Sequence, residues 1–239
     1  MRRKYKDKII DIIDTMFMAH DEVIKELHNK EYDKVLDILA VCQEGAIAIG
    51  NTVEEQHTEE TDIINDLVEY CKVLYEISLR IYEIDDLDQV LNDKLVEIQE
   101  KIQNKIKVHY EIVFLPYKSS MWDSLESIWR AAHEDENCIC RVIPIPYFDK
   151  NPDGTFAKEY YEGNNFPDYV PITHYNEYSL EENMPDIIYY HNPYDEYNRV
   201  TSVHPAFYSS KLKNYCTQLV YVPYFIAGYY TFIKSASST

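Results

Sequence analysis

All ten prolines of the chain lie between Pro116 and Pro223, and none precedes Pro116. Proline breaks helices and ends strand pairing, so the first part of the chain is free to form long helices and the second part must be built from short elements. Most of the 23 tyrosines also fall in the second part. This shift in composition predicts two domains, residues 1–107 and residues 108–239.

Residues 1–107 carry apolar side chains three or four positions apart, with acidic residues between them. That spacing predicts amphipathic helices, and the short connections predict an antiparallel four-helix bundle. The first expected helix ends near residue 29, and the second covers about 32–49 with a stop at Gly50-Asn51. The third starts near Thr58, and the fourth covers about 87–106. The isolated His20, His28 and His57 are interpreted as solvated or capping residues.

The second part contains four short apolar runs, "HYEIVFLPY", "CICRVIPIPYF", "PDIIYYHNPY" and "TQLVYVPYF". Such runs, when helix-length segments separate them, are typical of buried parallel strands with crossovers. We therefore expect an α/β chain, in which the helical bundle precedes a Rossmann-like parallel-sheet half-domain. The long connection between Phe148 and Pro185 is rich in tyrosine and acid. Its length suggests a lid or binding loop, and its tyrosines suit either a sugar or a partner protein.

The net charge of -19 argues against nucleic-acid binding, which depends on lysine and arginine neutralising phosphates. The five cysteines are scattered and odd in number, which favours reduced thiols in the cytoplasm over disulfides. They also lack the spacing of a zinc site. No apolar run is long enough for a membrane span, although the basic amphipathic start leaves peripheral membrane contact open.

Ligands of open parallel sheets bind beyond the carboxyl ends of the strands. The residues there that we interpret as acceptor-binding or anion-binding are Lys118, Ser119, Ser120, Asp123, Tyr147, His191, Asn192, Tyr194, Asp195 and His204. The first of these loops has no glycine, so it cannot bring its backbone against a pyrophosphate as dinucleotide-binding loops do. It still opens a helix, and its serine hydroxyls and lysine favour an anion.

Several of these residues allow two interpretations. Asp123 either favours the start of a helix or takes a proton from a hydroxyl substrate. His191 and Asp195 suit acid–base chemistry, but the same segment has the composition of a turn. No residue is assigned a catalytic role, and neither a cofactor nor a metal is expected.

The segments "LPYKSSMWDSLESIWRAA", "VIPIPYFDKNPDGTF", "YEGNNFPDYVPIT", "PDIIYYHNPYDEYNRVTSVHPAFYS" and "LVYVPYF" resemble a known family. They are similar to the amino-terminal portion of bacterial CDP-glycerol glycerophosphotransferase-like proteins, which make teichoic-acid-type polymers at the inner face of the membrane. The resemblance covers about residues 108–230. It implies one lobe of a two-lobed GT-B-like fold, with the CDP-linked donor and the principal catalytic histidines in a carboxyl-terminal lobe.

On that resemblance the chain forms the acceptor side of a transferase, and we expect no activity from these residues alone. The expected partners are a small-molecule or polymer phosphate acceptor and the carboxyl-terminal donor lobe. The expected location is the cytoplasm, with the inner membrane face left open. The alternative is a non-enzymatic interaction or regulatory module, for which a homo-oligomer is also open.

Overall fold

The computed structural model describes residues 1–56, 61–81, 87–193 and 197–224. The chain divides into two compact units, Met1–Tyr110 and Glu111–Thr239, close to the predicted boundary after residue 107. Within the described residues it is an α/β protein with long helices, a four-stranded parallel sheet and a separate antiparallel sheet.

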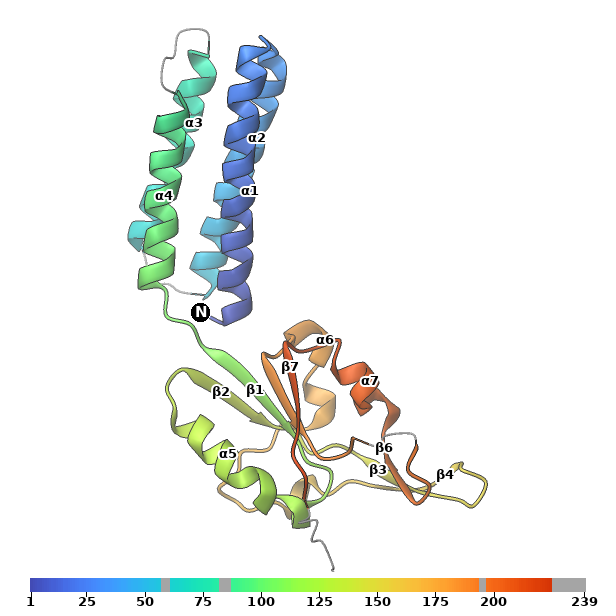
Figure 1. Cartoon of the computed structure of the whole chain (residues 1–239). Helices are drawn as coiled ribbons and strands as arrows, with labels where there is room; N and C mark the ends of the chain where they lie inside the picture. Colours follow the sequence, from blue (N-terminus) through green and yellow to red (C-terminus); the bar gives the residue numbers. More distant parts are fainter. Residues whose placement is uncertain (57–60, 82–86, 194–196, 225–239) are drawn as a thin grey trace, which may run out of the picture. The chain divides into compact units, whose positions relative to one another are not determined.

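The first unit is a bundle of long helices that run in alternating directions (Figure 1). Among the described residues these are α1 (Arg3–His28), α2 (Tyr32–Gln56), α3 (Thr61–Leu79) and α4 (Leu87–Lys105). Their apolar stripes meet in one core, in which residues such as Ile13, Leu39 and Leu95 are at most 3% exposed. The predicted pairing of antiparallel neighbours follows from the short connections.

Helix α2 does not stop at Gly50-Asn51, so that prediction is wrong; the helix continues to Gln56. Ile49 and Val53 are both fully buried on either side of the glycine. Burying each stabilises the helix by about 1.5–3 kcal/mol, which exceeds the cost of about 1 kcal/mol for a mid-helix glycine. By length and composition α2 is also apolar enough to cross a membrane, but core helices of soluble proteins meet the same criterion. The predicted helix start near Thr58 lies outside the described residues.

A buried polar chain crosses the bundle and contains one residue from each helix. His20 Nδ1 lies 2.8 Å from Asn92 Oδ1, and His20 Nε2 lies 2.7 Å from the Tyr70 hydroxyl. Tyr70 is also hydrogen-bonded to Cys42. The interpretation of His20 as a solvated or capping residue is therefore wrong, because its ring is fully buried and both nitrogens have partners. His57 lies outside the described residues.

The second unit is built around a sheet whose strands lie in the order β2-β1-β5-β7. Their bounds are β1 (Tyr110–Leu115), β2 (Cys138–Val142), β5 (Ile187–Tyr190) and β7 (Gln218–Tyr221). The parallel register places Ile112 opposite Ile187. All of β1 after its first residue is buried, as expected of a central strand covered on both faces.

Alternate side chains of β1 enter two different hydrophobic cores. Val113 packs with Leu212 of α7 (Ser209–Leu212), on the face that α6 (Leu180–Asn183) also covers. Phe114 packs on the other face with Trp122 and Trp129, the latter on α5 (Asp123–Glu134) (Figure 1). Helices therefore lie on both sides of the sheet, and its carboxyl edge is left for the loops.

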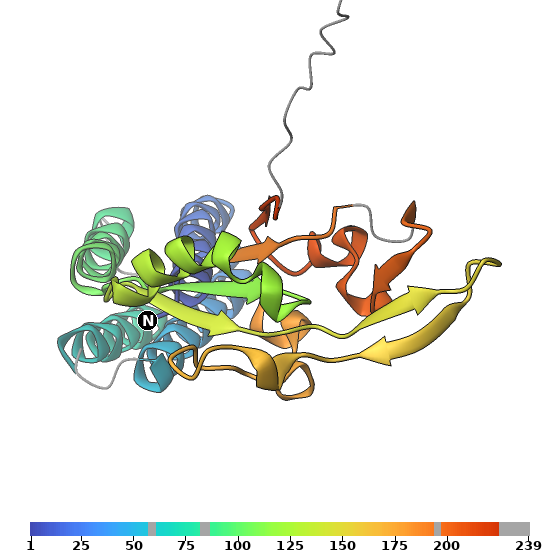
Figure 2. The same ribbon diagram turned by 90° about the horizontal axis from the view of Figure 1, so that it is seen from below.

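The second run of the sequence is not one strand, because it contributes to two sheets. After β2 the chain passes Pro144 and Pro146 and then forms β3 in an antiparallel sheet of order β4-β3-β6. These strands are β3 (Tyr147–Lys150), β4 (Phe156–Tyr160) and β6 (Thr201–Val203). The long connection predicted as a lid thus begins within the hairpin of β3 and β4, which extends from the rest of the unit in Figure 2. It continues through short helical turns and α6.

Candidate functional site

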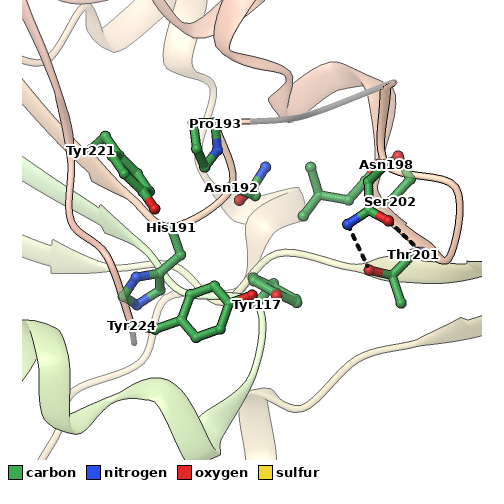
Figure 3. A pocket seen from close by; sticks show the side chains of 10 residues that line it. Tyr117, His191, Asn192, Pro193, Asn198, Thr201, Ser202, Tyr221 and Tyr224 are labelled. Carbon is green, nitrogen blue, oxygen red and sulfur yellow. Dashed lines mark hydrogen bonds between the residues drawn. The ribbon is translucent and has the colours of Figure 1, made fainter. Parts of the chain in front are cut away.

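The loops that follow β1, β5 and β7 surround a pocket at the carboxyl edge of the parallel sheet (Figure 3). We call it the strand-end pocket; its walls include Tyr117, His191, Asn192, Asn198 and Tyr224. Its cavity volume is about 40 Å³. Since one buried water needs about 10–15 Å³ on this measure, the pocket has room for a few waters or a small polar group and not for a nucleotide.

The wall formed by the loop before β6 uses most of its polar groups internally. Asn198 Oδ1 accepts the backbone N–H groups of Val200 at 2.9 Å and Thr201 at 3.2 Å. The Ser202 hydroxyl lies 2.9 Å from the Tyr208 hydroxyl. In Figure 3, Asn192 and Tyr117 lie between this loop and Tyr224. Burial and the neighbouring Tyr224 hydroxyl raise the pKa of Tyr117, so its phenol stays protonated.

His191 is part of the wall of the strand-end pocket, and its side chain is fully buried. Its Nδ1 lies 2.9 Å from the carbonyl oxygen of Val222, which fixes Nδ1 as the protonated nitrogen. Its Nε2 faces the Ser124 hydroxyl at 3.4 Å. Burial lowers the pKa of the ring, so His191 is neutral at neutral pH. His191 therefore links the ends of β5 and β7 to α5 and presents no exposed nitrogen to a ligand.

A second group of polar residues forms around the first strand-end loop. Glu162, in the turn after β4, places its carboxylate against this loop: Oε2 accepts the Ser119 backbone N–H at 2.9 Å and the Ser119 hydroxyl at 3.0 Å. Oε1 accepts the Tyr147 hydroxyl at 2.7 Å. We call Lys118, Ser119, Tyr147 and Glu162 the anion cluster. The loop predicted to favour an anion therefore already holds one, which comes from the protein itself.

The charge states in the anion cluster follow from these bonds. Burial acts to raise the pKa of Glu162, but the bonds from Ser119 and Tyr147 and the charge of Lys118 outweigh it and lower that pKa. Burial and the Glu162 carboxylate raise the pKa of Tyr147. At neutral pH the cluster therefore contains an ionised carboxylate and a protonated phenol.

Tyr117 connects the two groups of residues. It lines the strand-end pocket, and its ring packs edge-on against Tyr147, with ring centroids 5.4 Å apart. The Lys118 ammonium lies over both rings, 5.7 Å from the Tyr117 centroid and 5.0 Å from that of Tyr147. The structure thus brings Lys118, Ser119 and Tyr147 together, and it places Asn192 and the backbone end of β5 next to them.

The remaining predicted residues do not join these groups or are not described. Ser120 and Asp123 are exposed. His204 is exposed and caps the short turn η5 (Pro205–Phe207), where its Nδ1 accepts the Ala206 N–H at 3.2 Å. Its capping role explains it without a ligand. Tyr194 and Asp195 lie outside the described residues.

Sequence reasoning missed two side chains that shape the site, Glu162 and Ser124. Neither stands at the end of a strand of the parallel sheet, and Glu162 reaches Ser119 across 43 positions of sequence. In the part of the chain that the structure describes, no three His, Cys, Asp or Glu side chains gather as a metal site would require. The site therefore offers hydroxyl, amide and ammonium donors, which suit an anionic or polyhydroxy ligand.

The fold and site define an α/β protein with a polar, anion-holding edge on its parallel sheet. No family model, curated protein or solved structure matches the chain. The resemblance to glycerophosphotransferase-like proteins consequently depends on the sequence segments quoted above and stays a prediction.

Proposed function

We propose that this chain is the acceptor-side portion of a glycerophosphotransferase-like enzyme, which transfers glycerol phosphate from CDP-glycerol to a polyol-phosphate acceptor. In this proposal the parallel-sheet unit is one lobe of a GT-B-like fold, and a separate lobe holds the donor. The reaction takes place in the cytoplasm, at the inner membrane face where the acceptor polymer grows.

The observation that carries the proposal is the anion cluster. The amide and hydroxyl of Ser119 and the Tyr147 hydroxyl converge on one carboxylate, the Lys118 ammonium lies over the adjoining Tyr147 ring, and the same donors suit a phosphate. The strand-end pocket beside them offers amide and phenol groups to an adjoining hydroxyl. Its small volume suits the end of a glycerol phosphate chain better than a nucleotide.

In the complete reaction the terminal hydroxyl of the acceptor attacks the phosphorus bonded to the glycerol of CDP-glycerol. The new bond joins that oxygen to the glycerol-bearing phosphorus, the bond to the bridging oxygen breaks, and CMP leaves; the hydroxyl proton passes to a base. Transfers of this kind depend mainly on positioning and on stabilising the developing charge. The role assigned to the residues here is to hold the acceptor phosphate so that its terminal hydroxyl faces the donor.

Calorimetric titration with glycerol 3-phosphate, CMP and CDP tests the proposal. We expect glycerol 3-phosphate to bind and Lys118→Ala to abolish that binding, because the phosphate loses the ammonium that lies over the Tyr117 and Tyr147 rings. Lys213→Ala, an exposed lysine beyond α7, is the matched control and should leave binding unchanged. Tight binding of CDP, or turnover of CDP-glycerol by the isolated chain, contradicts the assignment of the donor to another lobe.

A second candidate function is a protein-interaction module, and the outer face of α2 favours it. Val41 and Ile47 are 60% and 53% exposed there. Grooves of about 450 and 300 Å³ flank the helix on its α1 and α3 sides. Glu44 and Glu54 are on the rims of these grooves. Apolar grooves with acidic rims fit a basic amphipathic helix of a partner protein and disfavour a second, equally acidic copy of this chain.

Fluorescence anisotropy with a labelled leucine–lysine helical peptide tests this second candidate. We expect the peptide to bind, its leucine–glutamate counterpart not to bind, and Val41→Arg to remove binding. Val96→Arg, at an exposed site on α4, is the control. Equal behaviour of the two peptides, or of the two variants, contradicts this docking surface. A stable dimer in light scattering that Val41→Arg dissociates would assign the surface to a second copy instead.

A further inference from the structure

We propose that Glu162 is an internal stand-in for the acceptor's phosphate, and that ligand binding displaces its carboxylate from the anion cluster. The proposal rests on the proposed function, because it concerns the same donors. It adds Glu162, which lies outside the strand ends. Its carboxylate competes with the ligand for the donors of the anion cluster and so lowers the apparent affinity for that ligand.

The geometry around Glu162 is that of a bound ligand. The carboxylate accepts three hydrogen bonds of 2.7–3.0 Å from two residues of other elements, Ser119 in the loop after β1 and Tyr147 on β3. One donor is a backbone N–H, one is a serine hydroxyl and one is a phenol whose raised pKa keeps its proton in place. Phosphate oxygens accept from the same kinds of donor.

Lys118 supplies the full positive charge of the anion cluster, and this charge lowers the pKa of Glu162. Its ammonium lies over the rings of Tyr117 and Tyr147, and among the described residues it has no carboxylate within 4.0 Å. A phosphate monoester carries more negative charge than a carboxylate and has three acceptor oxygens. A phosphate can therefore accept from the Ser119 and Tyr147 donors and still turn a further oxygen toward the Lys118 ammonium.

Displacing Glu162 needs only a side-chain movement. The residue is half-buried, and its side chain has rotatable bonds that let the carboxylate turn toward water. The following turn, η2 (Gly163–Asn165), is fixed independently, since the Asn165 N–H donates to the Glu162 carbonyl at 2.9 Å and Tyr161 packs over Gly163. The carboxylate can therefore leave while the backbone stays.

The occupancy of the donors by Glu162 lowers the apparent affinity for an external anion. If the donors are filled for about 90–99% of the time, affinity falls by about 10- to 100-fold. Removing the carboxylate should recover that factor, whereas a purely structural Glu162 would give no gain. A gain in phosphate affinity therefore identifies a residue that competes with the ligand, and no gain or a loss identifies a structural one.

Titrations of wild type, Glu162→Ala and Glu162→Gln with inorganic phosphate and glycerol 3-phosphate test the inference, with glycerol as the uncharged control. Glu136→Gln, which neutralises an exposed carboxylate in the turn after α5, is the matched control variant. We expect both Glu162 variants to bind the two phosphates at least about tenfold more tightly than wild type. Lys118→Ala added to Glu162→Ala should remove the gain, and Glu136→Gln should show none.

Two results overturn the inference, and they differ in what they say about the proposed function. Unchanged or weaker phosphate binding by folded Glu162→Gln, with glycerol 3-phosphate still bound by wild type, overturns displacement and leaves the acceptor site in place. Absence of phosphate binding by every folded form overturns both proposals. Tryptophan fluorescence identifies folded variants, because both tryptophans are buried in the second unit.

Discussion

Replacing Glu162 by glutamine tests how much the charge of this carboxylate contributes to the free energy of unfolding of the second unit. The carboxylate accepts three hydrogen bonds, from the Ser119 N–H, the Ser119 hydroxyl and the Tyr147 hydroxyl. Hydrogen bonds to charged groups contribute about 1 kcal/mol more than neutral ones. Glutamine keeps one carbonyl oxygen but loses the charge. After allowance for partial exposure, the free energy of unfolding should fall by about 2 kcal/mol at neutral pH.

The pH dependence of this loss has a defined sign. The folded-state pKa of Glu162 is lowered, so its contribution to stability is fully present above the unfolded-state value of about 4.3. It disappears as the pH falls through the lower, folded-state value. The gap between wild type and Glu162→Gln should therefore be constant near neutral pH and close in acid.

Urea unfolding followed by tryptophan fluorescence measures this gap in the second unit alone, since Trp122 and Trp129 are the chain's two tryptophans. Glu136→Gln provides the control and should change the unfolding free energy by less than about 0.5 kcal/mol. A neutral-pH gap of under about 0.5 kcal/mol for Glu162→Gln, or a gap that persists unchanged in acid, would refute the account of the anion cluster.

Three further substitutions have expected outcomes elsewhere in the chain. Gly50→Ala should stabilise the bundle by about 0.5–1 kcal/mol in unfolding followed by far-UV circular dichroism, because the added methyl meets Leu67 and Ile64 at ordinary distances of 3.8 and 3.9 Å; a loss of stability would contradict this. Tyr70→Phe should cost about 1–3 kcal/mol in the same assay, because it leaves the buried His20 Nε2 without its donor, and an unchanged transition would contradict the buried polar chain. His204→Ala should change unfolding of the second unit by no more than about 1 kcal/mol and leave glycerol 3-phosphate binding unchanged, because the exposed ring caps η5 and contacts Phe148 and Phe207; lost binding would restore it to the site.

The bundle and the parallel strands were predictable because each has a local periodicity. Ile9, Ile13 and Met16 repeat at helical spacing, and the run in β1 is apolar at every buried position except Glu111. The stop expected at Gly50 was wrong, because burial of the residues around it is a tertiary effect that local propensity does not include.

The antiparallel sheet was not predictable from hydrophobic patterns. Strand β4, "FAKEY", is exposed at every position except its last, and β6 has only three residues. Neither has the apolar run or clear alternation that identifies a strand. Only the turn at Asn151–Gly154 gave a local signal of the hairpin, and its Gly154 has the positive φ of 86° that such a turn favours.

The candidate site was predictable in position and less so in detail. Lys118 and Ser119 were predictable because they follow β1. Tyr147 was predicted at the edge of the same sheet but begins β3 of the antiparallel sheet, and the structure still brings the three together. The burial of His191 depends on Val222 and Ser124, which come from other elements, and Glu162 arrives from a distant turn. Pairings across such sequence distances leave no local pattern.

The most direct test of the central claim is to observe the Ser119 amide by NMR while glycerol 3-phosphate is added. We predict a saturable shift of this amide, accompanied by changes at Tyr147 and Glu162 and absent in Lys118→Ala. Shifts confined to the bundle, or none at Ser119 when glycerol 3-phosphate is bound, would contradict a phosphate site in this loop.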